Sequence, residues 1–506
     1  MADEDDAAPT DADYLLNPTQ HHVILPTLKS LRPTLTLTSL PTPIGLLTSL
    51  TFLELGSCPN LTHLPSELSQ CVHLRILFIK GCRNMCAIPP VLGEMPGLTR
   101  LGLKSNGLRI IEGKAIPPNV EHLILTDNEI KLIDHEAFVR LGSSCRKLML
   151  SHNKLTTLGN NDDDITLLQQ LELIRLSNNL LENFPTSLFL LPKVAWVAIS
   201  GNPKLSATVV PPSLSASSSS GSSGSSGFSA VPRVPTIDPS ELVLDSGASV
   251  LGSGASGNVV HGQWKGKEVA VKIFHAVTSD GLSRDEMAIQ QHVGGGRCNH
   301  LVAAIGVIRW PGVENRVGVV MEMLPMSMTD LALPPTIEEV IEDRWQENEI
   351  FIFSFVVSTL RSIAEALKYL HNERSTSHGD VYAHNIVVNR QGSGEEASAR
   401  LLDLGAAYYY GGFGGDEKEQ GGGEGEQKKS SDNICFEKIE VRAFGVLMEE
   451  LLERCSSMKG EEEEERGGKR KLMKLMRLCL NENVCDRPTF IDILNTMKDL
   501  STRSKV

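Results

Sequence analysis

The sequence predicts a multidomain α/β and α+β protein, in which an N-terminal solenoid of short parallel strands precedes a bilobal C-terminal domain. Three observations predict this class: a leucine pattern that recurs from Leu50 onward, a Ser/Gly-rich stretch at 213–227, and an ordered series of glycine-rich, strand-like and acidic motifs after it. At 506 residues the chain has room for roughly two to four domains.

Charge and hydropathy disfavour several classes of function. The formal net charge is −14, whereas nucleic-acid and anionic-membrane binders usually carry a basic surface. The most apolar stretch begins at Ile350 and meets Arg361, well short of the ~20 apolar residues that cross a bilayer. The acidic N-terminus lacks the apolar segment of a secretory signal. We therefore expect a cytoplasmic protein with no membrane span and no nucleic-acid partner.

The cysteines also favour a reducing compartment. None of the ten forms a CxxC pair, which disfavours a zinc site. Cys58 and Cys82 stand at positions where the recurring pattern accepts a small buried group, so we expect them to be free thiols.

The pattern L-x-x-L-x-L-x-x-N/C recurs seven times, with starts 22–26 residues apart. This period is typical of leucine-rich repeats, in which each repeat adds one parallel strand and its leucines enter a shared core. The Asn or Cys would bond backbone groups inside a turn. The strict spacing disfavours the alternative, a leucine-rich amphipathic helical protein. The motifs begin at Leu50, Leu74, Leu98, Val120, Cys145, Leu171 and Val194.

Positions between the leucines should face outward on one concave sheet, and a row of apolar side chains there favours a protein partner over a mere scaffold. The apolar positions are Phe52, Ile76, Phe78, Ile124, Met149, Leu173 and Trp196, and the basic ones are Lys80, Arg100, Lys104, Lys147 and Arg175.

These features give four segments. Residues 1–20 form a disordered acidic N-terminus, and 21–207 form a leucine-rich repeat domain of about seven repeats with a degenerate cap. Residues 208–238 form a Ser/Gly/Pro-rich linker that cannot bury a core. Residues 239–502 form the C-terminal domain.

The C-terminal domain opens with a phosphate-binding pattern. Residues 252–259 follow G-x-G-x-x-G-x-V, whose glycines allow the backbone to approach phosphates. A dinucleotide fold would need a helix next, but a strand pattern follows, and then a second strand ending at Lys272. Lys272 needs an acidic partner. Glu286 is the best candidate, and Asp285 is an adjacent competitor.

Further motifs follow in order: His378 to Asn385 resembles H-R-D-L-x-x-x-N, Asp403 begins a D-L-G that resembles D-F-G, and residues 486–490 read D-R-P-T-F. With the strand that ends at Lys272, they resemble a protein kinase of the tyrosine-kinase-like group, over Leu242 to Leu500. With the repeats, the chain resembles an intracellular leucine-rich repeat protein kinase.

The resemblance implies an ATP- and Mg²⁺-dependent transfer of the γ-phosphate to a hydroxyl of a protein substrate, with Ser/Thr favoured over Tyr. It assigns catalysis to Asp380, Lys272, Glu286, Asn385 and Asp403, and metal binding to Asn385 and Asp403. The nucleotide-binding set is Leu251, Gly252, Ser253, Gly254, Ala255, Ser256, Gly257, Val259, Ala270, Lys272, Met321, Glu322, Leu324 and Val387.

The chain also departs from the family. Gly379 replaces the Arg that usually binds a phosphorylated activation loop, and Tyr382 replaces a Lys that serine/threonine kinases use against the γ-phosphate. His384 is a candidate electrostatic substitute for that Lys, if its imidazole is charged. No A-P-E motif is present, and Glu437 is a candidate partner for Arg487 in its place. A pseudokinase scaffold that binds nucleotide and acts through protein contacts is therefore the alternative function.

Overall fold

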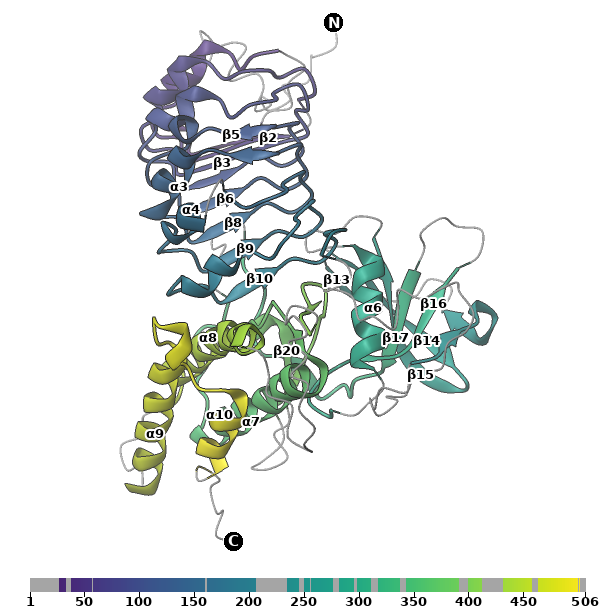
Figure 1. Cartoon of the computed structure of the whole chain (residues 1–506). Coiled ribbons are helices and arrows are strands. Elements are labelled where there is room, and N and C mark those ends of the chain that lie inside the picture. The colour runs from purple at the N-terminus through teal and green to yellow at the C-terminus, as the bar shows by residue number, and fades with distance from the viewer. Residues whose placement is uncertain are drawn as a thin grey trace, which may run out of the picture. The chain divides into compact units, whose positions relative to one another are not determined.

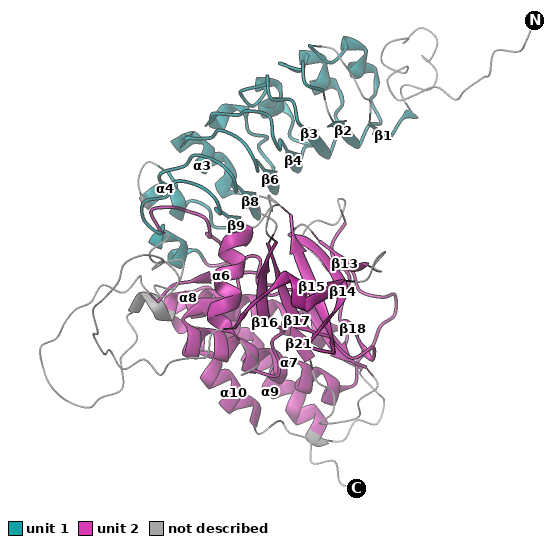
Figure 2. Ribbon diagram, turned by 90° about the vertical axis from the view of Figure 1, so that its right-hand side faces the viewer, with its two compact units in different colours: residues 1–191 teal, residues 192–506 magenta. Residues whose placement is uncertain are grey.

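The computed structural model describes residues 27–32, 38–56, 58–159, 162–205, 234–244, 250–254, 256–275, 282–294, 298–310, 317–336, 343–390, 399–411, 431–456, 463–498 and 500. The predicted segment 1–20, the Ser/Gly stretch 213–227 and Ala255 lie outside these residues. The chain divides into two compact units, residues 1–191 and 192–506 (Figure 2). Within the described part, no helix is both long enough and apolar enough to cross a membrane.

The first unit contains a parallel sheet whose strands follow one another in chain order (Figure 1). Its strands are β1 (Ser30–Leu31), β2 (Phe52–Gly56), β3 (Ile76–Lys80), β4 (Arg100–Gly102), β6 (His122–Ile124), β8 (Lys147–Met149) and β9 (Leu173–Arg175). The register aligns the central leucine of each motif, as in the pairs Leu53–Leu77 and Leu101–Leu123. These four side chains are fully buried, so one stacked core runs through the strands.

Short helical turns return the chain from each strand to the next. They are η2 (Thr42–Leu46), η3 (Ser66–Gln70), η4 (Pro90–Glu94), η5 (Gly113–Ala115), α3 (His135–Gly142), α4 (Asp162–Thr166) and η6 (Thr186–Leu190). The strands β5 (Ile110–Ile111) and β7 (Leu132–Ile133) pair in parallel beside them. Asp134 caps α3, because its carboxylate accepts a hydrogen bond from the Ala137 N–H.

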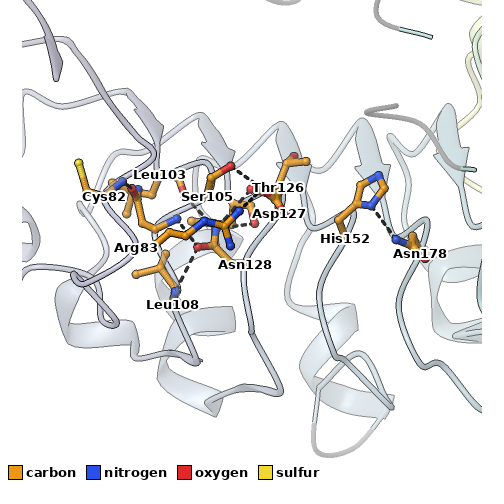
Figure 3. A network of polar contacts seen from close by, with 12 residues as sticks. Cys82, Arg83, Leu103, Ser105, Leu108, Thr126, Asp127, Asn128, His152 and Asn178 are labelled. Carbon is orange, nitrogen blue, oxygen red and sulfur yellow. Dashed lines mark hydrogen bonds and ion pairs between the residues drawn. The ribbon is translucent and has the colours of Figure 1, made fainter. Parts of the chain in front are cut away.

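A ladder of buried asparagines joins successive turns (Figure 3). The Asn128 Oδ1 accepts from the N–H groups of Asn106 and Leu108, and its Nδ2 donates to the Leu103 carbonyl at 2.8 Å. Asn106 in turn accepts from the Cys82 N–H. The motif Asn therefore satisfies backbone groups of the preceding repeat, as its spacing predicts.

The sequence pattern did not reveal a second regularity of these turns. The residue before the motif Asn or Cys has positive φ in repeat after repeat, although four of these residues carry side chains that disfavour it. The residues are Gly81, Ser105, Asp127, His152, Asn178 and Gly201. Ser105 donates to the Asp127 carboxylate, and Asn178 contacts His152 (Figure 3). Their side chains thus form a polar row beside the asparagine ladder.

The strand side chains are less exposed than the sequence suggested. Phe52, Ile76 and Leu173 are buried, and so are Arg175 and Trp196. Phe52 is covered by Phe78 and by the Arg32 guanidinium. The expectation of an open apolar row is therefore wrong at these five positions. Lys80 and Lys104 are exposed, and Phe78, Arg100, Ile124, Lys147 and Met149 are half-buried.

The second unit begins with β10 (Trp196–Ala198), which is not a strand of the unit's twisted sheet. That sheet has the order β11-β16-β17-β15-β14-β12, with β13 paired to β14. These strands are β11 (Thr236–Ile237), β12 (Leu242–Leu244), β13 (Val250–Ser253), β14 (Gly257–Trp264), β15 (Lys267–Phe274), β16 (Ala304–Arg309) and β17 (Val317–Glu322).

Each face of this sheet has its own core. Phe274 and Val319 pack with Met287 of helix α6 (Ser283–Val293) on one face. Val271 and Val320 pack in a separate cluster on the other. The alternation of side chains along β15 therefore fixes which residues point toward α6.

The remainder of the unit is mainly helical. It comprises α7 (Phe353–Lys368), the π-helical turn η9 (Tyr369–Glu373), α8 (Ser431–Glu453), α9 (Glu463–Cys479), η12 (Val484–Asp486) and α10 (Phe490–Lys498). Two small sheets lie among these helices, β18 (Met328–Asp330), β20 (Ile386–Asn389) and β21 (Ala399–Leu401) in one, and β19 (Thr376–Ser377) and β22 (Tyr408–Tyr409) in the other. The unit is thus divided into a sheet-rich part and a helix-rich part, as expected for a bilobal domain.

Candidate functional site

The glycine-rich turn lies directly beside Lys272. Gly252 of β13 pairs with Val259 of β14, and Val259 pairs with Lys272 of β15. Since residues directly opposite in an antiparallel sheet point to the same face, Val259 and Lys272 share the face that turns toward α6. The register therefore brings the predicted phosphate-binding turn and the predicted lysine together.

The three glycines of the turn differ in what surrounds them. A Cβ on Gly257 would lie 2.4 Å from the Ile273 carbonyl oxygen, so close packing against β15 requires glycine there. A Cβ on Gly252 or Gly254 would meet no atom within 4 Å. Those two glycines leave open space over the backbone, which fits a turn that a phosphate group approaches.

Lys272 forms a buried ion pair with Glu286, and Asp403, whose side chain is partly exposed, joins it. The Lys272 Nζ lies 2.7 Å from the Glu286 Oε1 and 2.8 Å from the Asp403 Oδ1. The Lys272 side chain is 9% exposed and that of Glu286 is 3% exposed. The adjacent Asp285 does not take this role. Its Oδ2 is buried without a hydrogen-bond partner, and burial raises its pKa.

The three charged groups shift one another's pKa toward the ionised forms. Burial alone would lower the pKa of Lys272, but Glu286 and then Asp403 raise it above its ordinary value. Burial would raise the pKa of Asp403, and the Lys272 ammonium more than offsets this, so that pKa is lowered. An ammonium has three N–H donors, and two are used here. One donor therefore remains for an anionic ligand.

The loop at 378–385 is tied to the segment that carries Asp403. The His378 Nε2 lies 2.8 Å from the Leu402 carbonyl, and the Leu402 N–H donates to the Asn385 carbonyl at 2.8 Å. The Asn385 Nδ2 donates to the Asp380 Oδ2 at 3.1 Å and to the Asp380 carbonyl at 2.9 Å. Asp380, Asn385 and Asp403 are thereby held on connected loops.

Glu440 of α8 holds this loop through its backbone. The sequence did not assign this residue to the site. Its buried carboxylate accepts hydrogen bonds from the backbone N–H groups of His378 and Gly379, and from the Ser377 hydroxyl. The His371 Nε2 lies 2.6 Å from it. Its position at the start of the motif E-V-R-A-F-G was the available signal.

His384 is held by a second unassigned acid. The Asp343 carboxylate lies 2.5 Å from the His384 Nδ1 and accepts from the His384 N–H. Burial would lower the pKa of His384, but Asp343, followed by Asp380 and Asp403, raises it above its ordinary value. The imidazole therefore tends toward its cationic form beside Asp380.

Two of the expected adenine-binding residues, Ala270 and Met321, lie on the same face of the sheet as Lys272. Ala270 pairs with Met321 across β15 and β17, and Met321 packs against the core cluster that contains Val319. Val387 of β20 is buried. The Glu322 side chain forms an ion pair with Arg400, which leaves only its backbone for a base. Leu324 and Ser253 lie in described segments next to these strands, and Leu251 and Ser256 flank the glycines.

Arg487 has partners other than the expected acid. Its guanidinium donates to the carbonyl oxygens of Asn481, Lys438 and Pro192, and burial lowers its pKa to about 9. Glu437 accepts instead from the Phe490 N–H. The expectation that Glu437 pairs with Arg487 is therefore not met, because backbone carbonyls fill the guanidinium's donor positions.

Asn385 and Asp403 could bind a metal ion only if a ligand, such as a substrate phosphate, supplied further oxygen atoms. No group of three or more His, Cys, Asp or Glu side chains suited to a metal occurs in the described part of the chain. Asn385 and Asp403 supply oxygen atoms, which Mg²⁺ prefers, and Mg²⁺ usually binds through one or two carboxylates plus substrate phosphates. The pair fits such a shared site.

Comparison with known families agrees with this arrangement. Residues 246–497 match the family model described as protein tyrosine and serine/threonine kinase. The match contains the glycine-rich turn, the Lys272 cluster and the loop at 378–385.

Two curated relatives are similar to parts of the chain. A probable serine/threonine-protein kinase of Dictyostelium discoideum is 29% identical over 175 residues, which are 33% of this chain and 10% of that protein. The serine/threonine-protein kinase VIK of Arabidopsis thaliana is 27% identical over 154 residues, 30% of this chain and 32% of that protein. The chain thus spans a tenth and about a third of the length of these relatives.

Proposed function

Because residues 246–497 form a protein kinase domain, which implies the use of ATP and a divalent metal, we propose that this protein transfers the γ-phosphate of ATP to a hydroxyl of a protein substrate. We take the metal to be Mg²⁺. Serine or threonine is the favoured acceptor, since both relatives are named serine/threonine-protein kinases.

One observation carries this proposal. Lys272 bonds both Glu286, 14 residues away, and Asp403, 131 residues away, and the Asp403 segment is hydrogen-bonded to the loop that holds Asp380 and Asn385. A structural ion pair would need one acid. Two acids on one buried lysine, next to a glycine turn open to an incoming group, are what a phosphate-binding site needs.

The residues of the chain then have distinct tasks. Magnesium-ATP supplies the phosphoryl group and a cation that offsets its charge. Lys272, fixed by Glu286, holds phosphate oxygens with its remaining donor. Asp380, oriented by the Asn385 amide, accepts the proton of the substrate hydroxyl. Asn385 and Asp403 would hold the metal.

The second candidate is a pseudokinase scaffold, favoured by Tyr382 in place of the usual Lys and by Gly379 in place of the usual Arg. Incorporation of radiolabel from ATP into a generic protein substrate, followed by phosphoamino-acid analysis, separates the two. We expect labelled phosphoserine or phosphothreonine. Asp380→Asn should lower the rate by about 10²–10⁴-fold, because a positioned base contributes this much. Equal residual labelling in both proteins would favour the scaffold.

Nucleotide binding provides a separate test. Magnesium-ATP at 100 times its dissociation constant should stabilise the wild type by about 2.7 kcal/mol in a thermal-shift titration. Lys272→Met and Asp403→Asn should lose this stabilisation, whereas Asp380→Asn should retain it, because Asp380 faces the acceptor. Wild-type protein that shows no magnesium-dependent shift would contradict the assignment of the site.

For the first unit we propose a leucine-rich repeat solenoid whose strand face recruits a protein partner. The recurring register and the asparagine ladder support the solenoid. Arg100 and Lys104 form no ion pair within the described residues, although the chain as a whole has a net charge of −14. His122, which pairs with Arg100 across β4 and β6, is buried, and burial with the nearby cations lowers its pKa to about 3, so it is neutral. An acidic protein segment fits such a face.

A further inference from the structure

Strand β10 contacts the loop that carries Asp380, within the second unit. The Trp196 Nε1–H donates to the Val381 carbonyl at 2.9 Å. The Trp196 indole stacks on the Tyr382 ring with 4.4 Å between centroids and 7° between planes. Trp196 is 4% exposed, so its side chain is buried. A residue that the sequence placed on an outward row thus lies against the loop at 378–385.

The same strand explains the glycine beside Asp380. Gly379 has φ of +73°, and a Cβ there would lie 2.6 Å from the Val197 carbonyl oxygen and 2.7 Å from the Ala406 carbonyl oxygen. Any side chain at position 379 would therefore collide with β10. The space beside Asp380, where the resembling family has an arginine, is filled here by the Val197 and Ala406 carbonyl groups.

Two arginines fix the segment that leads into β10. The Arg442 Nε donates to the Lys193 carbonyl, and the Arg487 Nη2 donates to the Pro192 carbonyl at 2.8 Å. Arg442 lies on α8, the helix that also supplies Glu440 to the loop. One helix therefore holds both β10 and the backbone on which β10 packs.

The stack continues beyond Tyr382. The His384 ring lies 5.2 Å from the Tyr382 ring at an interplanar angle of 24°, and the buried Asp343 holds His384. The rings of residues 196, 382 and 384 form a continuous row along the loop. Such stacked rings favour one arrangement of the loop over its alternatives.

We propose that Trp196 is a positioning residue for phosphoryl transfer, and that β10 sets the geometry of Asp380 in the place of a phosphorylated activation loop. This inference rests on the proposed kinase activity. Trp196 touches neither substrate nor nucleotide in this role. It acts through Val381 and Tyr382, which lie between Asp380 and Asn385 in the loop. Holding these two residues in place keeps Asp380 and Asn385 aligned for the reaction.

The test compares Trp196→Ala with Trp264→Ala, which removes a tryptophan of β14 whose Nε1 donates to Glu241, away from the loop. Trp196→Ala should lower kcat at least about tenfold, since small misplacements near the reacting atoms cost this much. The KM for ATP and the magnesium-ATP thermal shift should stay within about twofold of wild type. Trp196→Phe, which keeps a ring, should recover part of the rate. Trp264→Ala should leave kcat unchanged.

A double variant tests whether Trp196 acts through the loop. Gly379→Ala should also lower kcat, because its Cβ displaces β10. If both changes act through one contact, Trp196→Ala combined with Gly379→Ala should be no worse than the more damaging single change. Multiplied losses would overturn the shared mechanism. Phosphatase treatment of the wild type should leave kcat unchanged, and a loss restored by rephosphorylation would overturn the proposal.

Hydrogen–deuterium exchange separates this inference from the kinase activity itself. Amides of residues 379–385 should exchange faster in Trp196→Ala and not in Trp264→Ala, whether or not the protein transfers phosphate. Unchanged exchange in Trp196→Ala, or a raised kcat, would overturn the positioning role. Failure of the kinase proposal would show differently, as wild-type labelling no greater than that of Asp380→Asn.

Discussion

The two units bury polar groups in opposite ways. In the first unit the buried groups are neutral and repeated, as in Asn106 and Asn128, whose hydrogen bonds reach back 20–27 residues. In the second unit they are charged and individual. Glu440 bonds backbone 61 and 62 residues away, and Lys272 bonds Asp403 across 131 residues.

This difference shows when a polar contact can be predicted. A repeat places the partner of each asparagine one period away, so the pattern that identifies the residue also identifies its partner. A unique carboxylate such as Glu440 has no period, and its partners meet only when α8 and the loop pack together. Loss of a repeated contact should therefore be local, whereas loss of a unique one should affect a whole site.

Glu440→Gln should give the largest effect on stability. The carboxylate accepts hydrogen bonds from the N–H groups of His378 and Gly379 and from the Ser377 hydroxyl. A glutamine would place its NH₂ group, which can only donate, against some of these donors. Disrupting a buried charged network costs on the order of 3 kcal/mol or more. Chemical denaturation measures the loss. A change below about 1 kcal/mol would show that the loop does not depend on this acid.

The pH dependence of stability sharpens the same point. Burial would raise the pKa of Glu440, but His371, then His378 and the Gly379 N–H, lower it below its ordinary value of 4.5. A carboxylate with a lowered folded-state pKa stabilises the fold above its unfolded pKa, and this contribution is lost as pH falls through the folded value. From pH 4.5 downward, wild type should therefore lose stability more steeply than Glu440→Gln. Parallel urea midpoints for the two proteins would contradict this.

Asn128→Ala should give a smaller, local effect. The change leaves the buried N–H groups of Asn106 and Leu108 without an acceptor, which should cost about 2–4 kcal/mol. The matched control is Asn119→Ala, since Asn119 is exposed and donates only to the Pro96 carbonyl; it should change stability by less than about 0.5 kcal/mol. Magnesium-ATP stabilisation should be the same in both variants. A fall in that stabilisation for Asn128→Ala would break the distinction between local and site-wide effects.

The sequence by itself determined the features that depend on local spacing. The 22–26-residue period predicted strands in register and asparagines that satisfy turns, and the structure has both. The motif residues identified the chemistry of the second unit, which the family match bears out as a protein kinase domain. The sequence favoured Glu286 over Asp285 but could not decide between them. Adjacent helix residues point about 100° apart, and the rotation of α6 relative to Lys272 is not set by local sequence. The packing of α6 on β15 turns Glu286 toward Lys272, and the two side chains form a hydrogen bond.

Only the tertiary structure decided what positions those motifs. The chain around Asp343 does not indicate that this acid holds His384, and the motif that begins at Glu440 does not reveal that its partner is the 378–379 backbone. Trp196 followed the repeat pattern and was expected to face outward, yet it lies on a loop 185 residues away. The physical reason is that a side chain's local pattern fixes which way it points from its own strand, whereas the surface it meets depends on how distant elements pack.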